Sequence, residues 1–220
     1  LKTKGDAWVK VKSLHDDYEG WMTLSLLEET DEITALQKPV FVTAGLLTRI
    51  SNESQAMHIP AGASLPAFAD GKCQINKQAF QVDGLVYNRL EHQPSSILVD
   101  KLVQPWLNAP YLWGGRTPLG VDCSGFVQVN FKLLGIDLPR DAWQQAQGGE
   151  PVDNINEAQP GDLVFFDDKE EIVHVGILLN KETVIHASGK VRVDPIDKKG
   201  IIHAQTGKRT YRLKAIRRYW

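Results

Sequence analysis

The second half of the chain changes its periodicity once, and this change restricts the fold more than any other feature. Within residues 123–134, apolar side chains follow Cys123 by three, four, eight and eleven positions, which is the spacing of one helix face. After Pro160 the apolar segments become short and strand-like. These segments are 163–166, 173–179, 184–187, 191–193 and 213–216. Helices followed by an antiparallel sheet predict an α+β fold.

A second helix is expected before the first. Ser95 or Ser96 can cap a helix that runs to about Trp106. Residues 108–121 are rich in glycine and proline and predict a loop that leads directly to Cys123.

The first ninety residues have a different character. Short candidate strands alternate with glycines there, and the stretches between them show no helical periodicity. The candidates are 7–11, 20–22, 40–42, 46–47 and 79–82. This pattern predicts one or two small β-barrels over residues 1–90, and Pro94 marks the boundary to a second domain over 91–220.

Composition excludes several classes of protein. With 42% hydrophobic and 24% charged residues, the 220-residue chain is an ordinary globular protein, and its net charge of -2 gives no attraction to nucleic acid. No apolar run is long enough to span a membrane. No signal peptide is visible, but Leu1 is not a natural start, so the compartment stays open. Two cysteines are too few for a disulfide framework or a zinc site. We expect a monomer without metal.

Cys123 is the candidate nucleophile. A single cysteine is commonly a small buried hydrophobe. Here, however, a glycine-rich loop enters a helix at Cys123, and both of its neighbours, Asp122 and Ser124, are polar. The free N–H groups of a helix N-terminus favour a thiolate and can also receive an oxyanion. Both properties suit acyl transfer.

His174 and His186 are the candidate base and its orienting partner. Each lies among apolar residues in a predicted strand, where an unpaired imidazole is costly. A satisfied core histidine is the alternative for each. If residues 180–182 form a three-residue loop, His186 lies across from Gly176 and diagonal to His174, on one face of the hairpin. The pair then resembles the second and third members of a catalytic triad.

Five ordered motifs carry a family resemblance. "PYLWGGRTPLGVDCSGFVQ" resembles the nucleophile signature of the NlpC-type cysteine peptidases, and four further motifs follow in that family's order. They are "LPRDAWQQ", "PGDLVFF", "HVGILL" and "VIHASG". The resemblance covers residues 95–190. It implies a papain-like domain with helices packed on an antiparallel sheet, and a catalytic set of Cys123, His174 and His186.

The same resemblance implies the reaction. Members hydrolyse an amide in bacterial peptidoglycan peptides, commonly between γ-D-glutamate and a diamino acid, either meso-diaminopimelate or lysine. The expected partner is therefore a cell-wall peptide, with no cofactor and no nucleic acid.

Further site residues follow from the resemblance. Tyr111 matches a tyrosine that lies near the oxyanion, although aromatic packing is an alternative. Asp122 and Ser124 match residues that hold the amine of an N-terminal L-Ala. Trp113 is expected to form a wall of the pocket. Arg140 either binds a substrate carboxylate or forms a structural salt bridge.

The front region resembles a bacterial SH3-like module in "GDAWVKVKSLHDDYEGWM". Residues 38–90 match such a module more loosely. If the first module is genuine, Leu1 falls inside it and further chain precedes this sequence. In similar two-part enzymes this module closes one end of the cleft, so that only peptides with a free N-terminus enter. Tyr18 and Glu19 are candidates for reaching the cleft.

Three other functions fit the same residues. The chain could be a wall-binding protein with an inactive second half. It could perform another acyl transfer, as an amidase or a lipid acyltransferase. It could also be an ungated autolysin, in which the front region binds intact wall. An intact Cys123, His174 and His186 set argues against the first.

Overall fold

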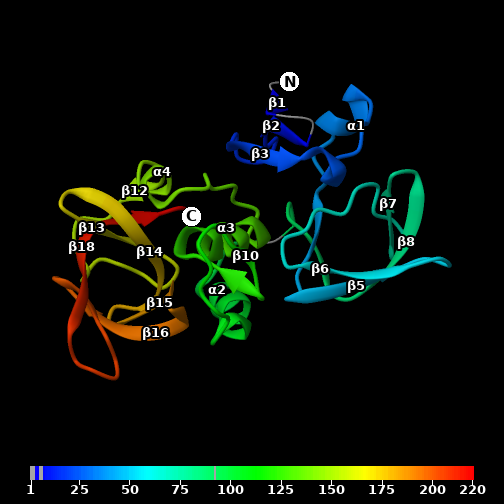
Figure 1. The fold of residues 1–220 in the computed structure, drawn as a ribbon. Helices are drawn as coiled ribbons and strands as arrows, with labels where there is room; N and C mark the ends of the chain where they lie inside the picture. Colours follow the sequence, from blue (N-terminus) through cyan, green and yellow to red (C-terminus); the bar gives the residue numbers. More distant parts are fainter. Residues whose placement is uncertain (1–2, 5–6, 92) are drawn as a thin grey trace.

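The fold is known from a computed structural model, which describes residues 3–4, 7–91 and 93–220 (Figure 1). The molecule has three parts in a row. The last strands form a barrel, a pair of helices lies in the centre, and the front region forms a set of small sheets. Gly5 and Asp6, which begin the SH3-like match, lie outside the described residues, as does Leu1, which was expected to fall inside the module.

Six antiparallel strands at the end of the chain close into a barrel. Its strands are β13 (Leu163–Asp168), β14 (Glu171–Asn180), β15 (Thr183–Ser188), β16 (Lys190–Asp197), β17 (Gly200–Ile202) and β18 (Arg209–Arg218). Closure results because β18 pairs with β13 along one edge and with β17 along the other. The short β12 (Glu150–Pro151) extends the edge of β18. All five predicted segments are strands, but β17 and the closure were not predicted.

Alternating side chains give the barrel two cores. Leu163 and Phe165 of β13 pack towards the helices, whereas Val164 and Phe166 pack inside the barrel. Such a strand is apolar on both faces, which explains the continuous apolar run in the sequence.

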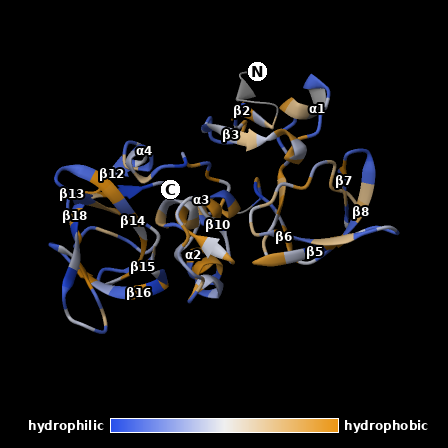
Figure 2. Cartoon of the chain, viewed as in Figure 1, coloured by the Kyte–Doolittle hydropathy of each residue, from blue (hydrophilic) through white to orange (hydrophobic). Residues whose placement is uncertain are grey.

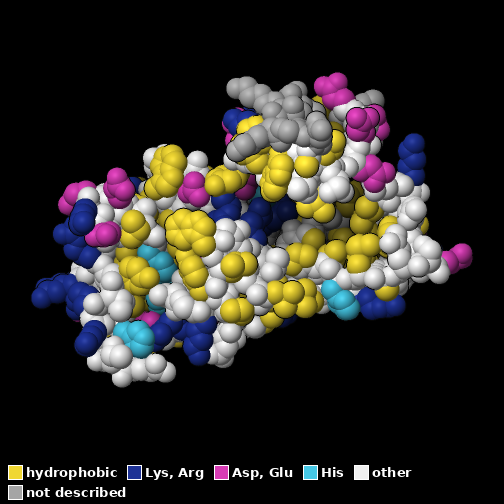
Figure 3. Space-filling model, viewed as in Figure 1, with side chains coloured by type: hydrophobic (Ala, Val, Ile, Leu, Met, Phe, Trp, Pro, Cys, Tyr) yellow, Lys and Arg dark blue, Asp and Glu magenta, His cyan; other side chains and the backbone are white. Residues whose placement is uncertain are grey.

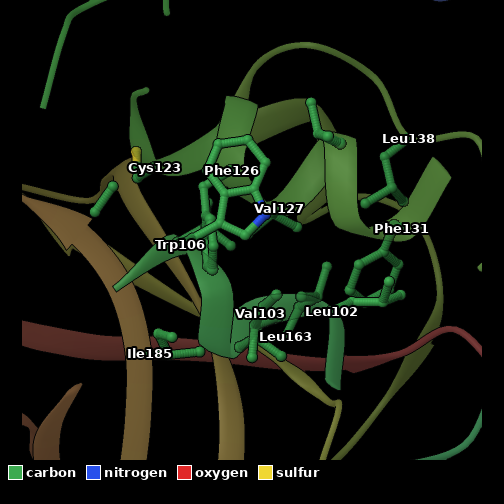
Figure 4. Close-up of a cluster of buried hydrophobic side chains, with 14 of the residues drawn as sticks. Leu102, Val103, Trp106, Cys123, Phe126, Val127, Phe131, Leu138, Leu163 and Ile185 are labelled. Carbon is green, nitrogen blue, oxygen red and sulfur yellow. The ribbon is translucent and has the colours of Figure 1, made fainter. Parts of the chain in front are cut away.

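The predicted helices are present. Ser95 caps α2 (Ser96–Val103) by accepting a hydrogen bond from the N–H of Leu98, and a 3-10 turn, η2 (Gln104–Trp106), continues it. Helix α3 (Cys123–Leu133) packs against α2, β14 and β15. Trp106 and Phe126 meet edge to face, 5.8 Å between ring centroids, in the core between them (Figure 4). A single turn, α4 (Ala142–Gln145), follows.

Residues 108–121 connect η2 to α3, as the loop prediction required. Two very short strands, β10 (Arg116–Thr117) and β11 (Gly120–Val121), form a small hairpin within this segment. The hairpin turns the chain back so that β11 runs directly into α3.

The front region is built from small sheets. β1 (Thr3–Lys4), β2 (Trp8–Lys12) and β3 (Glu19–Thr23) form one sheet, and β4 (Phe41–Thr43) pairs with β9 (Val86–Asn88). A further sheet contains β6 (Ala56–Pro60), β5 (Leu47–Ser51), β8 (Gln78–Asp83) and β7 (Lys72–Ile75), in that order. The strand predictions hold. A 3-10 turn, η1 (Leu24–Leu26), and a helical turn, α1 (Glu32–Leu36), link the sheets.

Apolar side chains follow the same division. In Figure 2 hydrophobic segments, in orange, are visible in α2 and β5, and the outer ends of the barrel strands are mostly hydrophilic, in blue. The sheet of β5–β8 has a separate small core, which includes Ile50 and Phe80. Among the described residues, no helix has the length and hydropathy needed to cross a membrane. Cys73 lies in this front core, and both it and Cys123 are free thiols.

Candidate active site

Cys123 is the first residue of α3. Asp122 caps the helix, because its carboxylate accepts a hydrogen bond from the N–H of Gly125 at 2.7 Å. The thiol is buried at the edge of the helix-facing core, with its sulfur at the start of α3 (Figure 4). The N–H of Val175 in β14 donates towards this sulfur, so the nucleophile lies beside the strand that carries His174.

A close approach holds the preceding loop against this helix turn. The N–H of Asp122 donates to the carbonyl of Gly115, and the N–H of Gly114 donates to the Asp122 carboxylate at 2.8 Å. A Cβ at Gly125 would lie 2.4 Å from the Gly115 carbonyl oxygen, so this position has no room for a side chain. The loop therefore fixes the helix start and, with it, Cys123.

His174 and His186 lie side by side, as the hairpin geometry predicted. Nε2 of His174 is 2.7 Å from Nδ1 of His186, and both imidazoles are buried. In the register of β14 and β15, Gly176 lies opposite His186. A Cβ at residue 176 would lie 3.1 Å from the His186 Cβ. The pair is possible because residue 176 has no side chain.

The loop that produces this arrangement differs from the prediction. Asn180 pairs with Thr183, so the turn has two residues, and the strand register shifts between Leu178 and Asn180. The bulge supplies the extra residue that the three-residue loop was expected to supply. Both solutions place the two histidines on one face.

Asp194 extends the pair and was missed from the sequence. Its Oδ2 lies 3.0 Å from Nε2 of His186, and the carboxylate also accepts hydrogen bonds from Arg192 and from the N–H of Ala204. The available signal was its position in β16: Val184 pairs with Asp194, so Asp194 lies diagonal to His186. Without the strand pairing, Asp194 looks like an ordinary polar strand residue.

The charge on Asp194 fixes the direction of this chain of hydrogen bonds. Burial alone would raise the pKa of Asp194, but the bonds from His186, Ala204 and Arg192 outweigh it and bring the pKa to about 2. The carboxylate can only accept, so Nε2 of His186 carries a proton. Burial lowers the pKa of both histidines, so both rings are neutral at neutral pH. Nδ1 of His186 therefore accepts from Nε2 of His174, which leaves Nδ1 of His174 as an unprotonated base.

Tyr211 holds the His174 ring from its face. The two rings are stacked with centroids 4.1 Å apart and planes 11° apart. The Tyr211 hydroxyl is bonded to Ser188 at 3.1 Å, which fixes the phenol in turn. The sequence analysis did not single out Tyr211, because it lies outside the five motifs.

The thiol of Cys123 is in its neutral form. Burial, followed by the negative charge of Asp122, raises its pKa to about 11, against the lowering effect of N–H groups from Val175, Ser124 and Cys123 itself. The helix N–H groups act in the expected direction, since those of Ser124 and Cys123 lower the pKa of the thiol. Desolvation and the capping carboxylate outweigh the helix dipole.

Tyr111 lies near the nucleophile. Its N–H donates to the carbonyl of Gly189, which fixes the backbone of this residue next to β15 and β16. Burial first, and then the charges of Cys123 and Asp122, raise the pKa of the phenol to about 12. The hydroxyl therefore keeps its proton and can donate a hydrogen bond.

Asp122, Ser124 and Arg140 form one buried cluster. Arg140 donates to both oxygens of Asp122, at 3.1 and 2.6 Å, and to the Ser124 hydroxyl at 2.9 Å. Of the two roles considered for Arg140, the structure shows the salt bridge. Burial would lower the pKa of Arg140, but the hydrogen bond and the charge of Asp122 raise it, so the guanidinium stays protonated.

Trp113 does not line an enclosed pocket. Its side chain is 85% exposed, in the loop before α3. It is therefore a surface residue of the loop that precedes α3.

The turn between β2 and β3 reaches the catalytic half. Asp16 accepts a hydrogen bond from Gln128 of α3 at 2.9 Å and lies 3.8 Å from Arg116. Tyr18 is close enough to Arg140 to affect its pKa. Glu19 instead forms an ion pair with Lys10 on the neighbouring strand. Of the two residues expected at the cleft, Tyr18 lies by the Asp122 cluster.

Comparisons with known proteins agree with this architecture. Residues 108–210 match the NlpC/P60 family. A gamma-D-glutamyl-L-lysine dipeptidyl-peptidase of Bacillus cereus is 29% identical over 94% of this chain and 70% of its own length. The Bacillus subtilis enzyme of the same name is 32% identical over 77% of this chain, which spans only 60% of that relative.

A solved structure shows the same fold. The crystal structure of an NlpC/P60 family protein from Bacillus cereus superimposes with a TM-score of 0.79, covering 100% of this chain and 78% of that one at 24% identity. The similarity extends through the front sheets as well as the barrel. The chain therefore contains an NlpC/P60 domain, which is the domain of a family of cysteine peptidases, and it is homologous to dipeptidyl-peptidases and endopeptidases of that family.

Proposed function

We propose that this protein hydrolyses the bond between γ-D-glutamate and the following diamino acid in cell-wall peptides that have a free N-terminal L-Ala. The observation that carries the proposal is the hydrogen-bonded chain His174–His186–Asp194 beside Cys123. The two Bacillus relatives are named gamma-D-glutamyl-L-lysine dipeptidyl-peptidases, and these names support the substrate class.

His174 is the proposed base. Because Nδ1 of His174 is unprotonated in the resting site, it can take the proton of the Cys123 thiol as the sulfur attacks the amide carbon. The imidazolium then donates this proton to the departing amine of the diamino acid, which leaves a thioester on Cys123. Water, deprotonated by His174, hydrolyses the thioester and restores the thiol.

The oxyanion of each step needs donors. The first-turn N–H groups of α3 and the Tyr111 hydroxyl, which stays protonated, are the proposed donors. Asp194 is a positioning residue in this scheme, because it acts on His174 only through the tautomer of His186. A neutral thiol–imidazole pair at rest means that the charge separates only when substrate is bound.

The substrate amine is the proposed ligand of the Asp122 cluster. A buried carboxylate next to the nucleophile suits an ammonium one residue away from the scissile γ-D-glutamyl unit. Arg140 neutralises Asp122 in the free protein, so substrate would share or displace this contact. Ser124 adds a hydroxyl, and Tyr18 closes the same end from the front region. Trp113 is the proposed flexible wall on the exposed side.

We also propose the finer architecture implied by the resemblance. The catalytic domain, residues 91–220, would be papain-like, with α3 packed on the barrel, and residues 1–90 would be SH3-like modules. The contacts of Asp16 with Gln128 and Arg116 support a gating role for the first module. An ungated autolysin would not need these contacts.

The test is hydrolysis of soluble L-Ala-γ-D-Glu-meso-diaminopimelate, of its lysine analogue, and of each peptide acetylated at its N-terminus. Products are identified by mass spectrometry, with Cys123→Ala as the control. We expect release of L-Ala-γ-D-Glu from the free peptides alone, and none with the variant.

Other outcomes select other functions. Cleavage of free and acetylated peptides alike would establish an ungated endopeptidase. Cleavage of neither, with wall binding retained, would favour the wall-binding protein. Release of an amine other than the diamino acid would indicate a different acyl transfer.

A further inference from the structure

A cavity lies away from Cys123 and His174, between the front region and the C-terminal end of α3. It has a volume of about 240 Å³, and its walls come from the β2–β3 turn, the segment after α1 and the C-terminal end of α3. In Figure 3 Lys and Arg side chains gather in a hollow at the centre of the molecule, below the sheet of β1–β3. Lys132 lies nine residues after Cys123, so about 14 Å of helix separates the cavity from the nucleophile.

The catalytic side of this cavity is cationic. Lys132 is buried, with 7% of its surface exposed, and its ammonium donates to the Ser64 hydroxyl at 3.1 Å. Among the residues that the structure describes, no carboxylate lies within ion-pair distance of this ammonium. Arg89 lies beside it and bonds to the Lys132 carbonyl and to Asp137. Nε2 of His15 is buried and has no hydrogen-bond partner in the described part of the chain.

Charges around Lys132 do not balance. Arg89 and Arg116 are cationic and Asp137 and Asp16 anionic, so with Lys132 the group carries one excess positive charge. His15 does not change this count, because burial and the Lys132 charge lower its pKa and keep it neutral. Lys38, which also lines the cavity, is exposed to water. An excess buried charge is costly unless a counter-ion meets it.

The opposite wall is apolar. Leu14, Leu36 and Pro39 line the cavity from the front region. A matching ligand therefore has one negative charge for Lys132 and a small apolar body for this wall. A phosphate, with more charge and no apolar part, fits less well.

We propose that this cavity binds a small organic monocarboxylate, whose carboxylate bonds to Lys132 and whose apolar body rests on the front region. Such a ligand joins the β2–β3 turn to α3, because His15 and Lys132 face it from the two parts. The same turn carries Asp16 and Tyr18 to the catalytic half, so the bound anion fixes the front region where it contacts the catalytic domain.

Isobutyrate is a suitable probe. The intact protein is titrated with sodium isobutyrate at constant ionic strength and pH 7, and binding is followed by the rise in melting temperature and by ligand-observed NMR. We expect a saturable rise, since a ligand that binds only the folded state stabilises it. The neutral analogue isobutyramide and inorganic phosphate should give no such rise. Equal binding of either would overturn the proposal.

Lys132→Met tests the contact directly, with Lys101→Met on the exposed side of α2 as the matched control. We expect Lys132→Met to lose at least about tenfold in isobutyrate affinity and Lys101→Met to lose none. Cys123→Ala should bind as the unaltered protein does, so the result is independent of peptidase activity. Unchanged affinity in Lys132→Met would overturn the proposal.

A pH titration needs no variant. Burial, followed by the charges of Arg89 and Arg116, lowers the pKa of Lys132 to about 8. Binding should therefore be strong at pH 7 and weaken by about tenfold or more at pH 9.5, where the ammonium has lost its proton. Equal affinity at both pH values would contradict the assigned contact.

Discussion

Nε2 of His186 lies 3.0 Å from Oδ2 of Asp194, inside the barrel and out of reach of water. This contact extends a Cys–His–His set to four residues and gives each ring nitrogen a defined role. A neutral hydrogen-bonding partner in place of Asp194 would leave the tautomer of His186 free. The carboxylate removes that freedom, because it cannot donate a hydrogen bond.

Replacing Asp194 should therefore impair catalysis more than stability alone explains. We expect Asp194→Ala to lower kcat by about 10- to 100-fold, with a smaller change in KM. Asp197→Ala, at an exposed position of the same strand, is the matched control and should leave kcat unchanged. Steady-state kinetics of the folded variants measure both. If Asp194→Ala changes only the melting temperature, Asp194 is merely structural.

The state of the thiol predicts a pH dependence. Because burial and Asp122 raise the pKa of Cys123 to about 11, the thiolate is scarce at neutral pH and increases as the pH rises. Alkylation by iodoacetamide should therefore be slow at pH 7 and accelerate through pH 10. Mass spectrometry of the intact protein gives the rate. A rate that levels off below pH 8 would show a thiolate at rest instead.

The paired hydrogen bonds from Arg140 to Asp122 predict that Arg140→Lys lowers stability more than Arg49→Lys does. Lysine cannot make the paired hydrogen bonds, so Arg140→Lys should lower the free energy of unfolding by about 1–3 kcal/mol. Arg49→Lys changes an exposed pair with Asp83 and should stay within about 0.5 kcal/mol. Urea unfolding monitored by fluorescence compares them. Equal losses of unfolding free energy would show that the buried pair contributes no more than the exposed pair.

Gating by the front region predicts a change in selectivity. Tyr18→Ala opens the end of the cleft near Arg140, so the preference for a free over an acetylated N-terminus should fall by at least about tenfold. Trp21→Ala, on the exposed surface of β3, should keep the preference. Ratios of kcat/KM for the two peptides provide the measurement. A preserved ratio in Tyr18→Ala would assign selectivity to the Asp122 cluster alone.

Much of the catalytic half could be predicted from local patterns. The helix at Cys123 and the strands around His174 follow from periodicity, and the shared face of the two histidines follows from counting along a hairpin. The prediction that both histidines share a face holds although the turn has two residues and not three. The bulge before Asn180 supplies the extra residue, so both rings still point to the same buried face.

What could not be predicted depends on strand pairing, between neighbouring strands for Asp194 and between distant strands for Tyr211. Asp194 acquires its role from the pairing of β15 with β16, and Tyr211 acquires its role from closure of the barrel. The sequence shows the helix start at Cys123 but not the burial that raises the pKa of its thiol. The turn of α1 is too short to give a periodic signal.

Closure by β18 also sets an order of events during synthesis. The ribosome releases Cys123 and His174 well before Tyr211, the residue that stacks on the His174 ring. Until β18 has emerged and joined β13 to β17, the base has no ring against its face and the barrel has an open edge. A nascent chain therefore has neither the closed barrel nor the stacked Tyr211 ring beside His174 until β18 has been synthesised.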